Sequence, residues 1–188
     1  MLCICFFVFE KYKNLKSVKC QDDLELSYKA KRDIIIETEK KERMKMEMTR
    51  DLERARNELE NGRYTCILCK GDEMYFSNDH GVKPLLVWIR ESRIRDGFAA
   101  ADQIVGKAAA LLYIKIGVAG LYAKVISEQA MPILKGYGIP FVYEHAVPFI
   151  MNRKGDDMCP MEKTVVGITD PESAVTALTE KVKEMSRK

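Results

Sequence analysis

The residues best suited to chemistry lie in the segment NRKGDDMCPMEK, near the carboxyl end of the chain. Cys159 directly precedes Pro160, which favours the first position of a helix, so the thiol is expected at a helix N-terminus, where dipole and free amides favour the thiolate. Glu162 falls in the first turn of that helix, where it can cap amides or move protons. Asn152 and Arg153 open a basic loop of a kind that binds carboxylates or phosphates. This segment could hold a nucleophile with its acid or base, or could be a loop and a capped helix start.

A second candidate is Lys107, which lies in the segment GFAAADQIVGKAAALLYIKIG, residues 97–117. The segment is apolar on nearly every side of a helical projection, which predicts one buried helix over residues 97–117. Lys107 would then either face a ligand, or pack its aliphatic stem at the edge of the core while its ammonium reaches solvent. Gly106 costs helix stability relative to alanine, which predicts that another group approaches the helix closely there. Asp102 is expected to support the first turn of the helix.

A third group of candidates lies at the start of another predicted helix. The apolar run VAGLYAKVIS predicts a buried strand that ends at Ser127, whose side chain can cap the helix in EQAMPILKGYG. The amides at such a helix start bind anions, so Ser127 and Glu128 are candidate ligand contacts. His80 lies in a turn and His145 ends the predicted strand IPFVYEH. A lone histidine is more often a surface or core residue than a ligand, so neither carries an assignment.

The cysteines do not form a metal-binding or disulfide pattern. Cys66 and Cys69 have the CxxC spacing, but they lie in the β-rich segment YTCILCK, and residues three apart on a strand point to opposite faces. The sequence has no second CxxC and no secretion signal that would favour disulfides. We therefore expect reduced thiols, no metal ion and no cofactor.

Composition narrows the class of protein. The 188 residues are 47% hydrophobic, enough for one sizeable core, and the net charge of +3 is too small to indicate a nucleic-acid partner. The N-terminal LCICFFVF is apolar over 8 residues, whereas a membrane-spanning helix needs about 20, and it lacks the features of a signal peptide. We expect a cytoplasmic protein that binds a small molecule and has no nucleic-acid or membrane partner. The sequence leaves formation of a homo-oligomer open.

The chain changes character near residue 48. Residues 1–48 are predicted to form a charged extension, disordered or helical, with several methionines that could be the translation start. From Thr49 the pattern becomes regular: a capped helix in TRDLERARNELENG is followed by a hairpin of YTCILCK and EMYFS around a Gly-Asp turn. Residues 49–188 are therefore predicted to form one folded domain.

The later elements predict an α/β fold. Pro84 marks a helix start after the polar loop NDHGVK, and the predicted helix over residues 97–117 is followed by strand, helix and strand. Right-handed crossovers between such strands give parallel pairing, so we expect a three-layer α/β/α sandwich with a mixed sheet and an N-terminal hairpin. A short helix beginning at Pro160 and an amphipathic helix started by Asp170 complete the domain.

This order of elements resembles the cytidine deaminase-like fold. More specifically, residues 65–162 resemble the uncharacterised family known as domain of unknown function 1893, through YTCILCKGDEMYFS, GVKPLL, AADQIVGKAAALLY, YAKVISEQA and NRKGDDMCPME. GKAAA and CPME are the most specific part of the match, which does not extend to residues 1–48. The resemblance implies a deaminase-like domain over residues 49–188.

The zinc chemistry of deaminases does not carry over with this resemblance. A zinc deaminase has His or Cys with Glu at the start of the central helix, and Pro-Cys-x-x-Cys at the start of the next helix. This chain has VGKAAA at residues 105–110 and SEQAM at residues 127–131, so no zinc ligand matches. The fold can be retained while the metal chemistry is lost.

Two functions are therefore expected. The first is a metal-free module that binds a small anionic or nucleotide-like ligand through Lys107, Arg153 and the helix start at Ser127. The second is a metal-independent enzyme in which Cys159 is the nucleophile or a redox thiol, with Lys107 or Glu162 as acid or base. The first is favoured because the sequence shows no complete set of nucleophile, base and orienting residue.

Overall fold

The computed structural model describes residues 49–62, 64–92, 94 and 96–187, and the single residues Asp33, Ile36 and Met46. The chain divides into two compact units, Met1–Lys45 and Met46–Lys188. The predicted extension over residues 1–48 falls almost wholly outside the described residues. In the described part of the chain, no helix is both long enough and apolar enough to cross a membrane.

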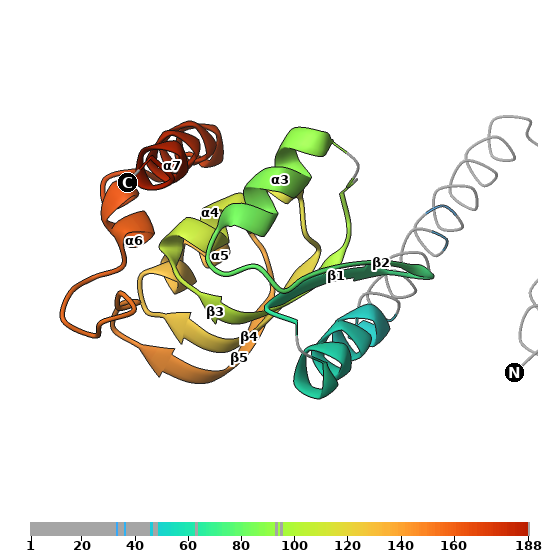
Figure 1. Cartoon of the computed structure of the whole chain (residues 1–188). Coiled ribbons are helices and arrows are strands. Elements are labelled where there is room, and N and C mark those ends of the chain that lie inside the picture. Colours follow the sequence, from blue (N-terminus) through green and yellow to red (C-terminus); the bar gives the residue numbers. More distant parts are fainter. Residues whose placement is uncertain are drawn as a thin grey trace, which may run out of the picture. The chain divides into compact units, whose positions relative to one another are not determined.

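A mixed sheet of five strands forms the centre of the second unit, among the residues that the structure describes (Figure 1). In spatial order the strands are β2 (Glu73–Ser77), β1 (Cys66–Lys70), β3 (Ala99–Val105), β4 (Gly120–Ser127) and β5 (Phe141–Val147). Strand β1 pairs antiparallel with both β2 and β3, whereas β3, β4 and β5 run parallel. The carboxyl ends of the three parallel strands therefore lie at one edge of the sheet, where ligands of α/β proteins commonly bind.

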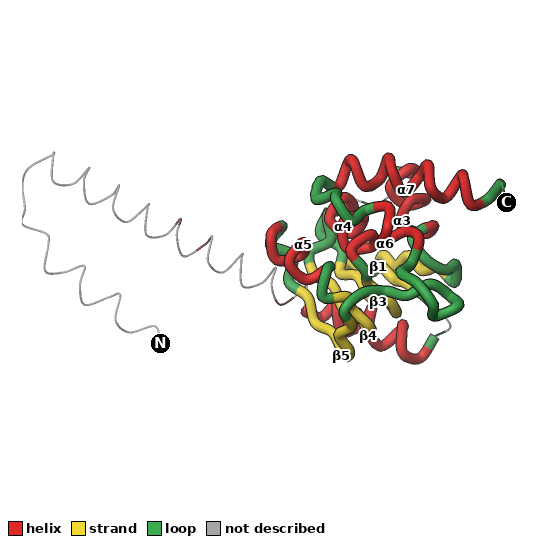
Figure 2. Tube along the Cα trace, turned by 90° about the vertical axis from the view of Figure 1, so that its left-hand side faces the viewer, coloured by secondary structure: helices red, strands yellow, loops and turns green. Residues whose placement is uncertain are grey.

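Helices cover both faces of this sheet. The helices α3 (Lys83–Glu91), α4 (Lys107–Ile116), α5 (Ala130–Gly136), α6 (Pro160–Thr164) and α7 (Pro171–Met185) follow β2 in the chain. Of these, α3, α4, α5 and α7 contribute to one buried cluster on one face, and in Figure 2 α3 and α7 lie above the strands. A helix over residues 49–61 buries Ala55 and Leu59 against the other face, beside Ile67 and Tyr122.

The predicted single helix over residues 97–117 is wrong. The segment forms β3 and then α4, and Gly106 lies between them in an extended conformation, with φ −91° and ψ −177°. Strand β3 is central in the sheet, so both faces are largely covered, and its sequence AAADQIV shows no regular alternation. A short apolar run of this kind cannot be distinguished from a buried helix by periodicity alone. Asp102 therefore lies on a strand and does not support a helix start.

The hairpin and the strands and helices that follow residue 117 are confirmed, as is the helix start near Pro84, whereas Thr49, predicted as a cap, is itself helical. The hairpin of β1 and β2 turns at Gly71, whose φ is +54°, and Pro84 lies in the first turn of α3. Strands β4 and β5 pair in parallel across the connection that contains α5. Helix α6 begins at Pro160. Asp170 caps α7 by accepting a hydrogen bond from the Ser173 amide at 2.7 Å.

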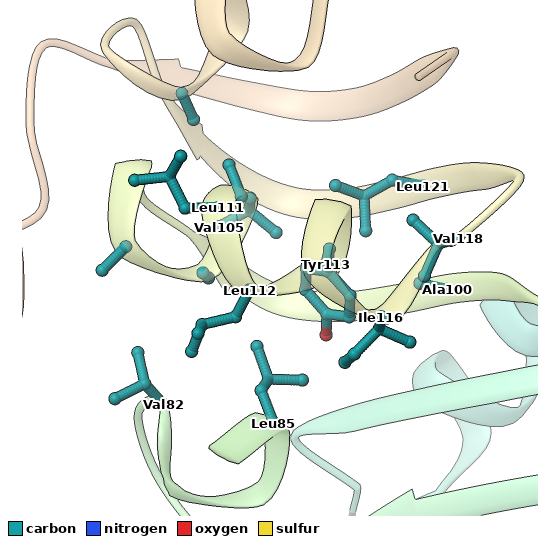
Figure 3. Close-up of a cluster of buried hydrophobic side chains, with 14 of the residues drawn as sticks. Val82, Leu85, Ala100, Val105, Leu111, Leu112, Tyr113, Ile116, Val118 and Leu121 are labelled. Carbon is teal, nitrogen blue, oxygen red and sulfur yellow. The ribbon is translucent and has the colours of Figure 1, made fainter. Parts of the chain in front are cut away.

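The core is built around α4. Leu111, Leu112 and Tyr113 are completely buried, and Figure 3 shows Leu112 pointing toward Leu85 of α3 while Leu111 lies on the other side, near Val105. Burying one leucine side chain stabilises the fold by about 1.5–3 kcal/mol. Contacts on several sides thus fix the position of α4, and with it the position of its N-terminus.

We propose that residues 49–188 fold as one domain, and removal of residues 1–48 tests this boundary. A protein that begins at Thr49 should unfold cooperatively, within about 0.5 kcal/mol of the full chain, because the buried clusters lie beyond that residue. Urea unfolding followed by circular dichroism measures this difference. Removal of residues 1–63 should instead cost several kcal/mol, because Ala55 and Leu59 leave the core. A comparable loss on removing residues 1–48 would show that the boundary is wrong.

Candidate functional site

Glu162, on α6, caps the N-terminus of α4. The residue is 3% exposed. Oε2 accepts a hydrogen bond from the Lys107 amide at 2.8 Å, and Oε1 accepts one from the Ala108 amide at 2.9 Å. The first amides of a helix lack partners within the helix, and the helix dipole favours negative charge at that end. Glu162 therefore joins α6 to the start of the most buried helix.

Gly106 makes room for this carboxylate. A Cβ atom at position 106 would lie 2.3–2.7 Å from the carboxylate atoms of Glu162, closer than real Cβ atoms come to other atoms. The backbone angles of Gly106 are ordinary extended values, so space, and not backbone conformation, requires glycine here. The close approach predicted at Gly106 is found, and the approaching group is a side-chain carboxylate.

Lys107 ties α4 to the segment that follows α6. The residue is 8% exposed, and its Nζ donates a hydrogen bond to the Val166 carbonyl at 2.7 Å. Burial raises the pKa of the Glu162 carboxyl, because loss of water outweighs the two amide hydrogen bonds and the Lys107 charge. The ammonium of Lys107 is thus used within the fold.

Asp102 is a second carboxyl held in place by hydrogen bonds. Its Oδ2 accepts from the Tyr113 hydroxyl at 2.6 Å, and its Oδ1 accepts from the Ile104 amide at 2.9 Å. Loss of water outweighs these bonds and raises the pKa of Asp102 to about 7. Burial, and then the Asp102 charge, raise the pKa of Tyr113 well above its ordinary value, so the phenol stays protonated and donates. Asp102 can therefore gain or lose a proton near neutral pH.

Asp102, Gly106 and Glu162 line one cavity of about 1230 Å³. Its walls come from the start of β1, the loop before α3, the second half of β3, the start of α4, residues 150–162 and the end of α7. Apolar side chains form much of the lining, including Val82, Ile104, Ala109, Ile150, Met161 and Val182. This volume accommodates a nucleotide-sized ligand.

Charged groups are unevenly distributed in the cavity. Asp102 and Glu162 are partly or fully buried, whereas Lys83, Arg153 and Lys154 line the cavity from exposed positions. The side chains of these three basic residues make no ion pair with any other described residue. Asp156 and Asp157 also line the cavity from exposed positions, but Asp156 accepts a hydrogen bond from Asn152 and Asp157 pairs with Lys163. The charges at the mouth without an ion-pair partner among the described residues are therefore the three cations.

The acidic side chains of the loop between β5 and α6 have hydrogen-bond or ion-pair partners in the loop or in α6. Asn152 Oδ1 accepts a hydrogen bond from the Gly155 amide at 2.9 Å, and Asn152 Nδ2 donates to Asp156 at 2.7 Å. Asp157 pairs with Lys163, and this hydrogen bond lowers the pKa of Asp157. Asn152 therefore shapes the loop, and the neighbouring basic residues remain available to a ligand.

The structure brings together part of the predicted site. The predicted residues that line the cavity are Gly106, Asn152, Arg153, Cys159 and Glu162. Cys159 is half-buried and precedes the first residue of α6 as predicted, and its amide donates to the Ile150 carbonyl at 2.8 Å.

Three predicted residues do not line the cavity: Lys107, Ser127 and Glu128. Ser127 is completely buried, and its Oγ caps the first amide of α5, that of Ala130, at 3.2 Å, although Gln129, and not Ser127 as predicted, holds the N-cap position. The start of α5 lies outside the cavity, so a ligand in the cavity does not meet this cap.

Asp102 is the main site residue that sequence reasoning missed. The signal was present, because an acidic residue inside an otherwise apolar run needs a partner or a function. The mistaken helix over residues 97–117 assigned it to a helix end instead. His80, Lys83 and Lys154 also line the cavity, and only the tertiary fold brings them there.

The thiols at Cys66 and Cys69 are free and buried, as predicted. Cys69 packs in the cluster beneath the helix over residues 49–61, whereas Cys66 lines the cavity on the other face. Burial raises the pKa of both thiols. Among the described residues, no group of three or more His, Cys, Asp or Glu side chains is placed to hold a metal ion.

The fold defines an α/β protein with a mixed five-stranded sheet and a cavity beside its central strand. The chain belongs to the family described as TM1506, domain of unknown function DUF1893, whose sequence profile matches residues 54–182. It is similar to the crystal structure, at 2.70 Å, of a DUF1893 family protein (TM1506) from Thermotoga maritima, with a TM-score of 0.66 and 31% identity. The similarity covers 70% of this chain and 90% of that chain. No curated protein matches the chain.

Replacing Gly106 with alanine tests the Glu162 cap. The Cβ would displace the carboxylate and leave the amides of Lys107 and Ala108 without a partner, so Gly106→Ala should lower the free energy of unfolding by about 2–4 kcal/mol. Gly136→Ala is the matched control, because nothing lies within 4 Å of a Cβ there, and a helical alanine is favoured by up to about 1 kcal/mol. Equal stabilities of the two variants in urea unfolding would contradict the cap.

Asp102 should make stability depend on pH. A carboxyl whose pKa is about 7 when folded binds its proton more tightly than in the unfolded chain, so its contribution falls as pH rises from about 4 to 7. The Asp102→Asn variant has no carboxyl to titrate and does not lose this stability. Between pH 5 and pH 8 its free energy of unfolding should therefore rise by about 2 kcal/mol relative to that of the native protein. Thermal unfolding across this range measures the difference.

Asp157→Asn provides the contrast for this pH series. Lys163 lowers the pKa of Asp157, so this carboxyl is ionised, and contributes its full stability, above pH 4. The destabilisation caused by Asp157→Asn should therefore be constant between pH 5 and pH 8. Parallel pH curves for Asp102→Asn and the native protein would show that Asp102 titrates normally.

Proposed function

We propose that this domain is a binding module for a small anionic, nucleotide-like molecule, on a cytidine deaminase-like fold that lacks the zinc site. The observation that carries the proposal is the cavity with Lys83, Arg153 and Lys154 at its mouth, where none of them makes an ion pair with a described residue. Basic side chains without partners, beside an apolar and partly enclosed space, suit a molecule with an anionic end and a flat apolar body.

The fold assignment rests on the order of the strands. An antiparallel hairpin of β2 and β1 joins a parallel set β3, β4 and β5, and helices pack on both faces of the sheet. These features support the deaminase-like label and the three-layer sandwich. Free thiols at Cys66, Cys69 and Cys159 support a reducing, cytoplasmic location.

The corrected element order moves the positions where a deaminase would carry zinc ligands. The helix that follows the hairpin is α3 and the next is α4, so the relevant segments are residues 82–84 and 106–110. They read VKP and GKAAA, with neither a cysteine nor a carboxylate. The metal-free proposal therefore keeps its support: residues 82–84 now stand at the first position, and residues 106–110 move from the first position to the second.

Binding is better supported than catalysis. Cys159 lines the cavity, but its two proposed partners are engaged elsewhere: both Glu162 oxygens accept α4 amides, and the Lys107 ammonium binds the Val166 carbonyl. A nucleophile needs a base within hydrogen-bond reach. The enzymatic alternative with Cys159 therefore lacks a free acid or base among the residues proposed for it.

Titration with ribose 5-phosphate and GMP tests the proposal by calorimetry. Both should bind, and Lys83→Met and Arg153→Met should each weaken binding about three- to tenfold by removing a charge that contacts phosphate. Lys135→Met is the matched control, because Lys135 is exposed on α5 and does not line the cavity. Absence of binding, or equal losses in all three variants, would refute an anionic site at the mouth.

A further inference from the structure

Asp102 is preorganised as a hydrogen-bond acceptor in the cavity. The Tyr113 hydroxyl holds one oxygen and the Ile104 amide holds the other, so the carboxyl group cannot turn freely. The nearby Gln103 amide also stabilises the carboxylate, but it donates its hydrogen bond to the Thr65 carbonyl at 3.0 Å. A carboxylate oxygen has two lone pairs, so each Asp102 oxygen keeps one after its contact within the fold. Both oxygens can therefore accept one further hydrogen bond from a ligand.

The other carboxyls that line the described cavity already have partners within the fold. In the exposed loop, Asp156 accepts a hydrogen bond from Asn152 and Asp157 pairs with Lys163. Among the described residues, Asp102 makes no ion pair, and no cationic side chain lowers its pKa. Each Glu162 oxygen likewise accepts one hydrogen bond, but both donors are amides at the N-terminus of α4 and the carboxylate lies against Gly106, so this carboxyl is held by the fold. The Gln103 side chain turns away toward the carbonyls of Leu59 and Tyr64, at 3.5 Å each.

We infer that Asp102 selects ligands whose planar head carries two parallel N–H donors, while the basic mouth holds their anionic tail. Two adjacent acceptors at the spacing of a carboxylate match a fork of two N–H groups, and such bidentate pairs are stronger and more directional than single bonds. This inference rests on the proposed function for the tail, but the head group is recognised independently by Asp102.

Two kinds of ligand carry such a pair of parallel N–H donors. One is the N1–H and N2–H edge of guanine, which is linked to phosphate in GMP. The other is a guanidinium group linked to a carboxylate, as in 4-guanidinobutyrate. The two share the fork, and they differ in charge and in the size of the apolar body.

Comparing GMP with IMP tests the head group, because IMP lacks only the 2-amino group. In the native protein GMP should bind about tenfold more tightly than IMP, which corresponds to one hydrogen bond to a charged acceptor. In Asp102→Asn this ratio should fall to about one, since an amide offers a single acceptor oxygen. Ribose 5-phosphate has no head group, so its affinity should be the same in both proteins. Asp72→Asn, in the exposed hairpin turn, should keep the native ratio.

Further titrations separate this inference from the proposed function. Guanosine and inosine carry the same heads without phosphate, so a preference for guanosine that Asp102→Asn abolishes would support the role of Asp102 even if ribose 5-phosphate did not bind. In that case only the proposal that the mouth binds an anionic tail would be refuted. Tighter binding of 4-guanidinobutyrate than of GMP would also support the fork and would identify its source as a guanidinium. Equal affinities of GMP and IMP for the native protein, with no binding of 4-guanidinobutyrate, would overturn the inference.

Discussion

The contact between the Glu162 carboxylate and the first amides of α4 determines how the site is assembled. It satisfies two donors that a helix cannot satisfy internally, and it places α6 against the most buried helix of the domain. The loop that precedes α6 is attached to it, and this loop forms one wall of the cavity. Gly106 is required because a side chain there would occupy the space of the carboxylate. One side chain thus connects the core to the cavity wall.

The same contact explains where an anion can bind. A helix N-terminus at the carboxyl end of a parallel strand is the usual position for a phosphate in α/β proteins. In this chain Glu162 already occupies that position at α4, so a ligand anion meets the basic side chains at the mouth instead. The interior keeps Asp102, whose oxygens are only partly used. The charged groups without an ion-pair partner among the described residues therefore run from Asp102 inside the cavity to the basic side chains at its mouth.

Local signals in the sequence predicted most of the fold. Proline at a helix start, an aspartate cap and a glycine turn each act over a few residues, and α6, α7 and the hairpin were predicted from them. Strand β3 was mistaken for helix because burial on both faces removes the alternation that identifies a strand. The sequence also indicated a close approach at Gly106, but not its partner, because Glu162 lies far along the chain and only the tertiary fold brings it there.

Asp102 and Glu162 show why residue type alone could not assign roles in the site. Both are carboxyls removed from water, and burial raises the pKa of each. Glu162 accepts hydrogen bonds from two amides at a helix N-terminus, where the helix dipole also favours its charge, so its carboxylate is stabilised within the fold. Asp102, on a strand, accepts hydrogen bonds from one hydroxyl and one amide and has no helix dipole or cation beside it, so its negative charge is less well stabilised. A donor-bearing ligand could supply what is lacking, and this difference in compensation makes Asp102 the group in the cavity that has most to gain from binding.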